Sequence, residues 1–373
     1  MERFSLGPSV GGDTMTVPSY AYHGSEEFNA RFHETVQAVA KDVEEALGDN
    51  LLGLVLGGGY GRGEGAVINE GGVEQPYNDL DFLLVVQHPG DVDQATIARI
   101  KTHHETLTPL HVDFTQPMTV QDLQKWPPWL MWHDFLNGHI VSSGDPQLLH
   151  KHVPKSVAGT LAPIEACRLL INRGAGLLWA MRIDRGLENK EDADFIKRNY
   201  WKCALALGDA LLIAHNSYTT SYRGRDKRFK ELSHKFADIS ELDIVPFYDD
   251  ALHFKFSPHE VTKPFDILEM GVLTSRVFLY IEQRRFKRSW ADHQAYAKWK
   301  GLREPEEHVP SKWTRNLYKA YRLGEYGWRY PIESVYRALP GLLYNTKRPG
   351  WEHESDRCLQ LWKGLMGVPI DEH

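Results

Sequence analysis

The chain has 373 residues, of which 42% are hydrophobic and 25% are charged, and its formal net charge is −7. This length exceeds what one small core requires and predicts two or three domains. The negative balance gives no general indication of nucleic-acid binding. The sequence has no apolar run of about 18 residues, and its first residues lack a signal peptide's apolar stretch, so we expect a cytoplasmic protein.

Helices and strands alternate in the first third of the predicted structure. Residues 1–24 are rich in Gly, Ser, Pro and Thr and are expected to form an extended arm. Apolar residues at helical spacing follow Ser25, and a short apolar run at 51–56 is typical of a buried strand. The elements expected next are a glycine-rich turn at 57–65, a polar hairpin or loop at 66–77, a strand at 80–86, a helix at 95–107 and a strand at 111–115.

Helices dominate the rest of the chain. The pattern Trp126-Pro127-Pro128-Trp129 indicates a rigid connector, and we assign residues 121–160 to it. Long helices are predicted at 164–181, 195–214 and 267–286 from their apolar spacing. The expected fold is α+β: the arm at 1–24, a mixed sheet with flanking helices at 25–120, the connector, and a mostly helical region of one or two subdomains at 161–373.

Three aspartates occur on two of the predicted strands. Because alternate side chains of a strand point to opposite faces, Asp79 and Asp81 share one face, and Leu80 lies on the other. Asp113 alternates in the same way with Val112 on the later strand. If both acidic faces lie on one side of the sheet, three carboxylates converge there.

Clustered carboxylates repel each other and need positive charge close by. Mg²⁺, or Mn²⁺ in its place, prefers oxygen ligands and leaves coordination positions for phosphates. Two such ions about 4 Å apart can hold the attacking and leaving oxygens of a phosphoryl transfer. In this interpretation Asp79 and Asp81 bridge the ions, and Asp113 holds the ion that activates the nucleophile. The alternative is that all three are solvated strand-end charges.

Cationic and glycine residues complete the set of candidate site residues. Gly58 and Gly59 follow an apolar strand, where backbone N–H groups can approach a phosphate closely. Arg62 in the same turn, together with Lys202 and Arg225 in the helical region, are candidates for phosphate contacts. A basic run is more often a solvated surface, and that alternative stays open.

The spacing of these motifs resembles the signature of the DNA polymerase beta-like nucleotidyltransferase superfamily. Gly58 and Gly59 match its Gly-Gly/Ser pair, and Asp79, Asp81 and Asp113 match its three acids. The interval from Gly59 to Asp79 is longer than usual, and Gly59 replaces the more common Ser. The resemblance covers residues 51–115 and implies a small mixed sheet with helices on one side, and two Mg²⁺ ions. It makes residues 25–120 the catalytic domain.

The resemblance implies transfer of a nucleoside monophosphate from a triphosphate such as ATP to an acceptor, with release of pyrophosphate. The later helices are similar in layout to the partner domains of bacterial small-molecule nucleotidyltransferases. We therefore expect a small-molecule acceptor rather than a nucleic acid or a membrane component. The alternatives are a nucleotide-binding regulator without catalysis, and an enzyme that modifies nucleic acid or protein. The sequence leaves the acceptor, the preferred base and the oligomeric state open.

Overall fold

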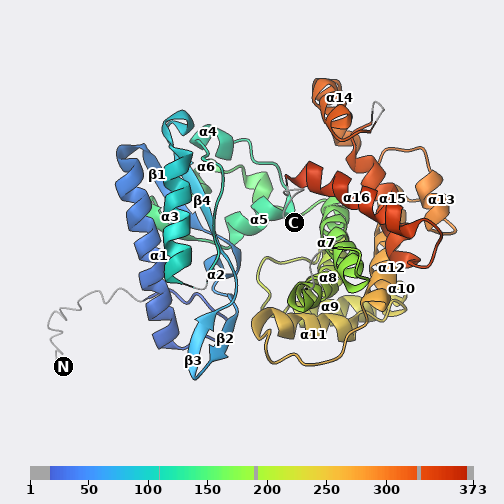
Figure 1. Ribbon diagram of the computed structural model, residues 1–373, viewed down its shortest axis with the longest axis horizontal. Coiled ribbons are helices and arrows are strands. Elements are labelled where there is room, and N and C mark those ends of the chain that lie inside the picture. Colours follow the sequence, from blue (N-terminus) through green and yellow to red (C-terminus); the bar gives the residue numbers. More distant parts are fainter. Residues whose placement is uncertain (1–16, 109, 189–191, 326–328, 368–373) are drawn as a thin grey trace, which may run out of the picture. The chain divides into compact units, whose positions relative to one another are not determined.

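The chain divides into two units, one that contains the β-sheet and one that is helical (Figure 1). The computed structural model describes residues 17–108, 110–188, 192–325 and 329–367. The first unit consists of the chain up to Val120 together with His139–Leu148, and the second consists of Gln121–Gly138 with Leu149–His373. The protein is thus of mixed α and β character, with a small mixed sheet and a mostly helical C-terminal half, as the sequence predicted.

The first unit is built on a four-stranded sheet. Its strand order is β5-β4-β1-β6, in which β4 runs parallel to β5 and β1 runs antiparallel to both β4 and β6. The elements of this unit are α1 (Glu26–Leu47), β1 (Leu51–Leu56), α2 (Gly58–Gly61), β2 (Val67–Glu70), β3 (Val73–Pro76), β4 (Leu80–Val86), α3 (Gln94–Leu107), β5 (Val112–Phe114) and β6 (Ile140–Gly144).

Helices α1 and α3 share an apolar core with one face of this sheet. Ser25 caps α1, since its Oγ accepts a hydrogen bond from the Phe28 N–H at 3.0 Å. The predicted apolar positions of α1 are buried, and they pack against Leu80 and Phe82 of β4 and Ile97 of α3. Leu80 and Phe82 therefore point into the core, which turns the intervening Asp81 to the opposite face.

Residues 66–77 form a hairpin, one of the two forms that the sequence allowed for, and its tip at 69–73 is exposed. Strands β2 and β3 pair antiparallel with each other and make a separate two-stranded sheet. The prediction of strands at 51–56 and 80–86 and of helices starting at Ser25 and near residue 95 is confirmed to within a residue at their starts.

The described part of the N-terminal segment, which we expected to be an extended arm over residues 1–24, packs against the first unit. Residues 1–16 lie outside the part of the chain that the structure describes. Tyr20 and Ala21 are buried in the core of the first unit. The Tyr20 N–H donates to Asn29 Oδ1 at 2.7 Å, and its hydroxyl lies 2.7 Å from His33 Nδ1. This part of the segment packs on α1 because the Tyr20 ring buries apolar area there.

The segment expected to be a connector contributes to both units. Strand β6 extends the sheet by pairing with β1, so that Leu56 lies opposite Ile140. Residues 121–138 and 149–160 belong to the second unit and include α5 (Leu130–Asn137). The short helices α4 (Val120–Leu123) and α6 (Leu148–His152) span two of the three points where the chain passes from one unit to the other.

The second unit is a helical assembly around one large apolar core. Helices α7 and α8 pack along each other, and α12 and α15 pack against α7. Its remaining described helices are α7 (Pro163–Asp184), α8 (Ala193–Ala214), α9 (Arg225–Lys235), α10 (Ala237–Ser240), α11 (Val245–Phe256), α12 (Ile267–Phe286), α13 (His293–Lys298), α14 (Trp313–Arg322), α15 (Ile332–Tyr344) and α16 (Trp351–Met366). Among the described helices, none combines the length and apolar character that a membrane crossing requires.

Loss of the α1 cap gives a test of the packing of the first unit. We expect Ser25→Ala to lower the free energy of unfolding by about 1 kcal/mol, because the Phe28 N–H loses its acceptor. The matched control is Thr35→Ala in the middle of the same helix, where alanine is the better helix former and stability should hold or rise slightly. Denaturant unfolding followed by circular dichroism measures both. Equal losses for the two variants would contradict the capping role.

Candidate functional site

Asp81 and Asp113 lie side by side on neighbouring strands. In the parallel pairing of β4 with β5, Asp81 is the register partner of Asp113, and Phe82 is the partner of Phe114. Register partners on adjacent strands point to the same face of a sheet. Both carboxylates therefore project from the face opposite the α1 and α3 core, where Asp81 is exposed and the Asp113 side chain is half exposed.

The glycine turn lies directly against Asp81. Gly58 begins the single helical turn α2 with φ +63°, a conformation that favours glycine. A Cβ atom at this position would lie 2.2 Å from Asp81 Oδ2, so no other residue fits without displacing the carboxylate. The Gly57 N–H donates to the Asp81 carbonyl at 2.8 Å and fixes the turn to β4. The structure thus places Gly58 and Asp81 together, with Gly59 next in the turn.

A buried tyrosine connects this turn to the segment that carries Asp79. The Tyr60 hydroxyl donates to the Ala66 carbonyl at 2.9 Å and accepts from the N–H groups of Tyr77 and Asn78 at 2.9 and 3.2 Å. Burial raises the pKa of Tyr60, and the negative charge of Asp79 adds to the rise, so the hydroxyl keeps its proton at neutral pH. Asp79 itself is exposed and precedes β4.

A cation from α3 neutralises Asp113. Lys101 Nζ lies 2.9 Å from Asp113 Oδ1, and His111 Nε2 lies 3.4 Å from the same oxygen. Glu105 completes the group, because its Oε1 accepts from the Val112 N–H at 3.0 Å and lies 2.6 Å from His111 Nδ1. Within the described residues, no three His, Cys, Asp or Glu side chains are grouped as a metal site would require. The three predicted acids are therefore not gathered into one ready-made ligand set.

Sequence reasoning missed Lys101 and Glu105. The signal for their mutual contact was present, since residues four apart on a helix are neighbours. Their contact with β5 has no such signal, because it depends on how α3 packs beside an edge strand.

The Arg62 side chain is largely buried within the glycine turn and lies near Glu64. Its side chain is only 13% exposed, and its Nε lies 3.7 Å from Oε2 of Glu64, which is 1% exposed. A buried carboxylate needs a nearby positive charge, and Arg62 supplies it. The contact that we expected between Arg62 and a triphosphate has to be made by a guanidinium already held by Glu64.

Lys202 and Arg225 both belong to the second unit. Lys202 is exposed on α8. Arg225 is completely buried: its guanidinium bonds Asp209 Oδ2 at 2.8 Å and the carbonyls of Thr219 and Thr220 at 2.9 and 2.7 Å. The expectation that Arg225 contacts a nucleotide is therefore corrected. Its charge holds the interior of the helical unit together and is not presented at a surface.

Comparison with known proteins adds no relative: no family model matches the chain, and no curated protein matches its sequence. The likeness to nucleotidyltransferases thus rests on the motif residues alone.

The Tyr60 hydroxyl provides a first test of how this site is held. Tyr60→Phe should lower the free energy of unfolding by about 1–3 kcal/mol, because it removes three hydrogen bonds between a buried hydroxyl and the backbone. Tyr20→Phe is the matched control, since Tyr20 is equally buried and its hydroxyl, among the described residues, hydrogen-bonds the half-buried His33 ring. Its cost should stay below about 1 kcal/mol. Amide hydrogen exchange at Asn78 should accelerate in Tyr60→Phe only; unchanged exchange there would argue against the link.

Arg225 provides a second test, because removing it leaves Asp209 buried without a cation. We expect Arg225→Met to cost about 3–5 kcal/mol in unfolding free energy. The comparison variant is Lys230→Met, which breaks the half-exposed ion pair with Asp249 and should cost less than about 1 kcal/mol. Chemical denaturation measures both. A small effect for Arg225→Met would show that Arg225 is not the structural cation assigned here.

Proposed function

We propose that the protein is a Mg²⁺-dependent nucleotidyltransferase that moves a nucleoside monophosphate from a nucleoside triphosphate to a small-molecule acceptor. The observation that carries this proposal is the in-register pairing of Asp81 with Asp113, with the Gly58 backbone packed against Asp81. Two carboxylates on one face beside a glycine turn can hold a cation next to a triphosphate. A cytoplasmic location is part of the same proposal.

The carboxylate oxygens fit the hard-cation chemistry of Mg²⁺. Lys101 and His111 both contact Oδ1 of Asp113, so Oδ2 is the oxygen that we expect Asp113 to offer. Asp81 would offer its carboxylate from the adjacent strand, and Asp79 would join from the exposed segment before β4. Mg²⁺ bound there would supply positive charge against the triphosphate and the departing pyrophosphate.

The chain's own groups then position the substrate. The N–H groups of Gly58 and Gly59 begin α2, and a first helical turn has no intrahelical acceptors for such groups. They would donate hydrogen bonds to phosphate oxygens. The Tyr60 hydroxyl keeps the turn and the Asp79 segment in fixed relation, so that phosphate and carboxylates meet without large rearrangement.

One observation favours a second candidate, a nucleotide-binding regulator without catalysis. The Lys101 ammonium already neutralises Asp113, so this acid has a positive charge beside it before any Mg²⁺ binds. A triphosphate could then bind through Gly58, Gly59 and one cation and remain intact.

Asp81→Asn separates these candidates when binding and turnover are measured together. With Mg²⁺ and each of the four common nucleoside triphosphates, the unaltered protein should release pyrophosphate in the presence of a metabolite pool. Asp81→Asn should lower that rate more than about 100-fold, because a metal-ligating carboxylate is lost. Asp91→Asn, an exposed acid of the same unit, is the control and should keep full activity.

Calorimetry with the same triphosphates completes the experiment. Tight binding without any pyrophosphate release by the unaltered protein would reject the enzyme and support the regulator. Normal release by Asp81→Asn would reject the site assigned to the reaction.

A further inference from the structure

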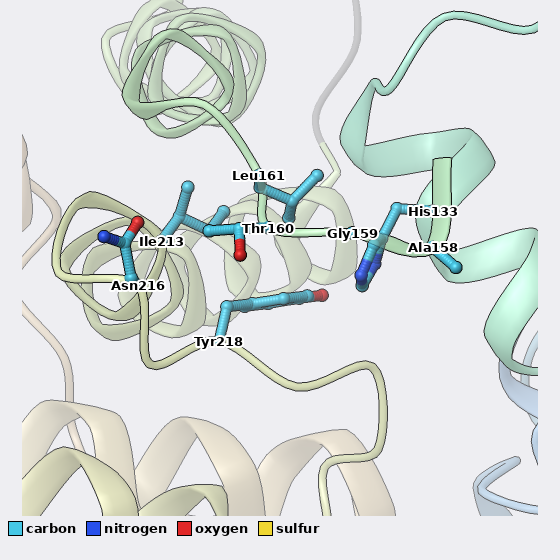
Figure 2. A pocket seen from close by; sticks show the side chains of 8 residues that line it. All are labelled: His133, Ala158, Gly159, Thr160, Leu161, Ile213, Asn216 and Tyr218. Carbon is cyan, nitrogen blue, oxygen red and sulfur yellow. The ribbon is translucent and has the colours of Figure 1, made fainter. Parts of the chain in front are cut away.

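A cavity of about 310 Å³ lies within the helical unit, and none of its lining residues belongs to the proposed transferase site (Figure 2). Its wall is formed by the segment before α7, the end of α8 with the loop that follows, and one residue of α5. The lining residues are His133, Ala158, Gly159, Thr160, Leu161, Ile213, Asn216 and Tyr218. This volume lies at the lower end of the range for small-molecule sites, so the ligand would be compact.

The Tyr218 ring is a rigid wall of this cavity. Its hydroxyl donates to Asp134 Oδ2 at 2.8 Å and accepts from Arg225 Nη2 at 3.1 Å. The Arg225 guanidinium also lies 4.4 Å from the ring centroid. Figure 2 shows the ring lying flat beneath Thr160, with its hydroxyl directed toward His133. Because two hydrogen bonds fix the hydroxyl and the Arg225 guanidinium lies over the ring, the ring is held in place with little ordering cost on binding.

The charge of the lining indicates a neutral ligand. Among the eight lining residues, none is a Lys, Arg, Asp or Glu. Asp134, behind the wall, already accepts from Tyr218, and Arg225 is paired with Asp209. A phosphate or carboxylate would find no cation in this lining, and an ammonium would find no carboxylate, so each would lose hydration without compensation.

Polar groups are spread around the cavity instead. Asn216 lies at one end and His133 at the other, with Thr160 between them (Figure 2). His133 uses Nδ1 for its contacts with Asp134 and Thr220, at 3.4 Å each, which leaves Nε2 for a ligand. Leu161 and Ile213 supply apolar surface.

We propose that this cavity binds a neutral, polyhydroxylated ring, which is a sugar or a cyclitol. Such a molecule has apolar C–H faces that can lie on the Tyr218 ring and hydroxyl groups around its edge that both donate and accept. Amide, hydroxyl and imidazole groups match that edge. The proposal stands whether or not the protein transfers nucleotides, since it uses residues of the helical unit alone.

Ligand-observed NMR by saturation transfer tests the proposal with the full-length protein. The neutral probes are myo-inositol and methyl β-D-glucopyranoside; glucose 6-phosphate, glucosamine and adenosine test anionic, cationic and planar aromatic ligands. We expect millimolar binding of at least one neutral probe and weaker or no binding of the other three. Binding of none, or only of the charged or aromatic probes, would overturn the proposal.

Two variants locate the binding. Asn216 has φ +55°, a conformation that glycine adopts without strain, so Asn216→Gly removes the amide and spares the backbone. Thr160→Val removes the hydroxyl at nearly constant shape. Each should weaken binding about fivefold, the value of one neutral hydrogen bond. The matched control is Asp243→Gly, an exposed residue of the same unit with φ +52° that does not line the cavity. Unchanged affinity in both cavity variants would place the probe elsewhere and reject this site.

Discussion

The parallel pairing of β4 with β5 is the constraint on which the first unit depends. It places Asp81 beside Asp113 while Leu80, Phe82 and Val112 enter the core on the other face. A register shift of one residue would move each acid to the apolar face and each apolar side chain to solvent, so burial of the core holds the two carboxylates together. Gly58 adds a steric condition, because its backbone occupies the space next to Asp81 where any side chain would collide. The same apolar residues that stabilise the unit thus define its chemistry.

The second unit uses buried charge in a comparable way. Arg225 satisfies Asp209 and several backbone carbonyls, and its guanidinium also lies over the Tyr218 ring. Tyr248 donates to the other Asp209 oxygen at 2.6 Å, so both oxygens of this buried carboxylate are bonded. A fully satisfied polar network of this kind rigidifies its surroundings. The wall of the cavity is therefore rigid for the same reason that the unit is stable.

Local patterns in the sequence predict much of this structure. Strict alternation in residues 79–82 and the helical spacing after Ser25 gave the right elements, because each pattern is set by neighbours along the chain. Other features depend on distant contacts. Lys101 contacts Asp113 only because α3 packs beside β5. In the sequence, Arg225 is part of a basic run that is typical of a solvated surface, and its ion pair with Asp209 depends on the packing of the helical unit. Residues 140–144 mix polar and apolar side chains, so their sequence does not indicate a strand, and the strand is defined by its pairing with β1. The role of Asp79, Asp81 and Asp113 in transfer stays a prediction.

The position of β6 in the chain has a consequence for how the protein forms. Strand β1 needs β6 as its second neighbour, yet β6 begins 84 positions after β1 ends (140 − 56) and comes after α5 of the other unit. Until the ribosome has delivered residues 140–144, the backbone of β1 presents one row of unpaired N–H and C=O groups that any other strand can occupy. The nascent sheet is thus exposed to intermolecular pairing for the time that the intervening segment takes to emerge, which gives a holding chaperone a defined interval in which to act.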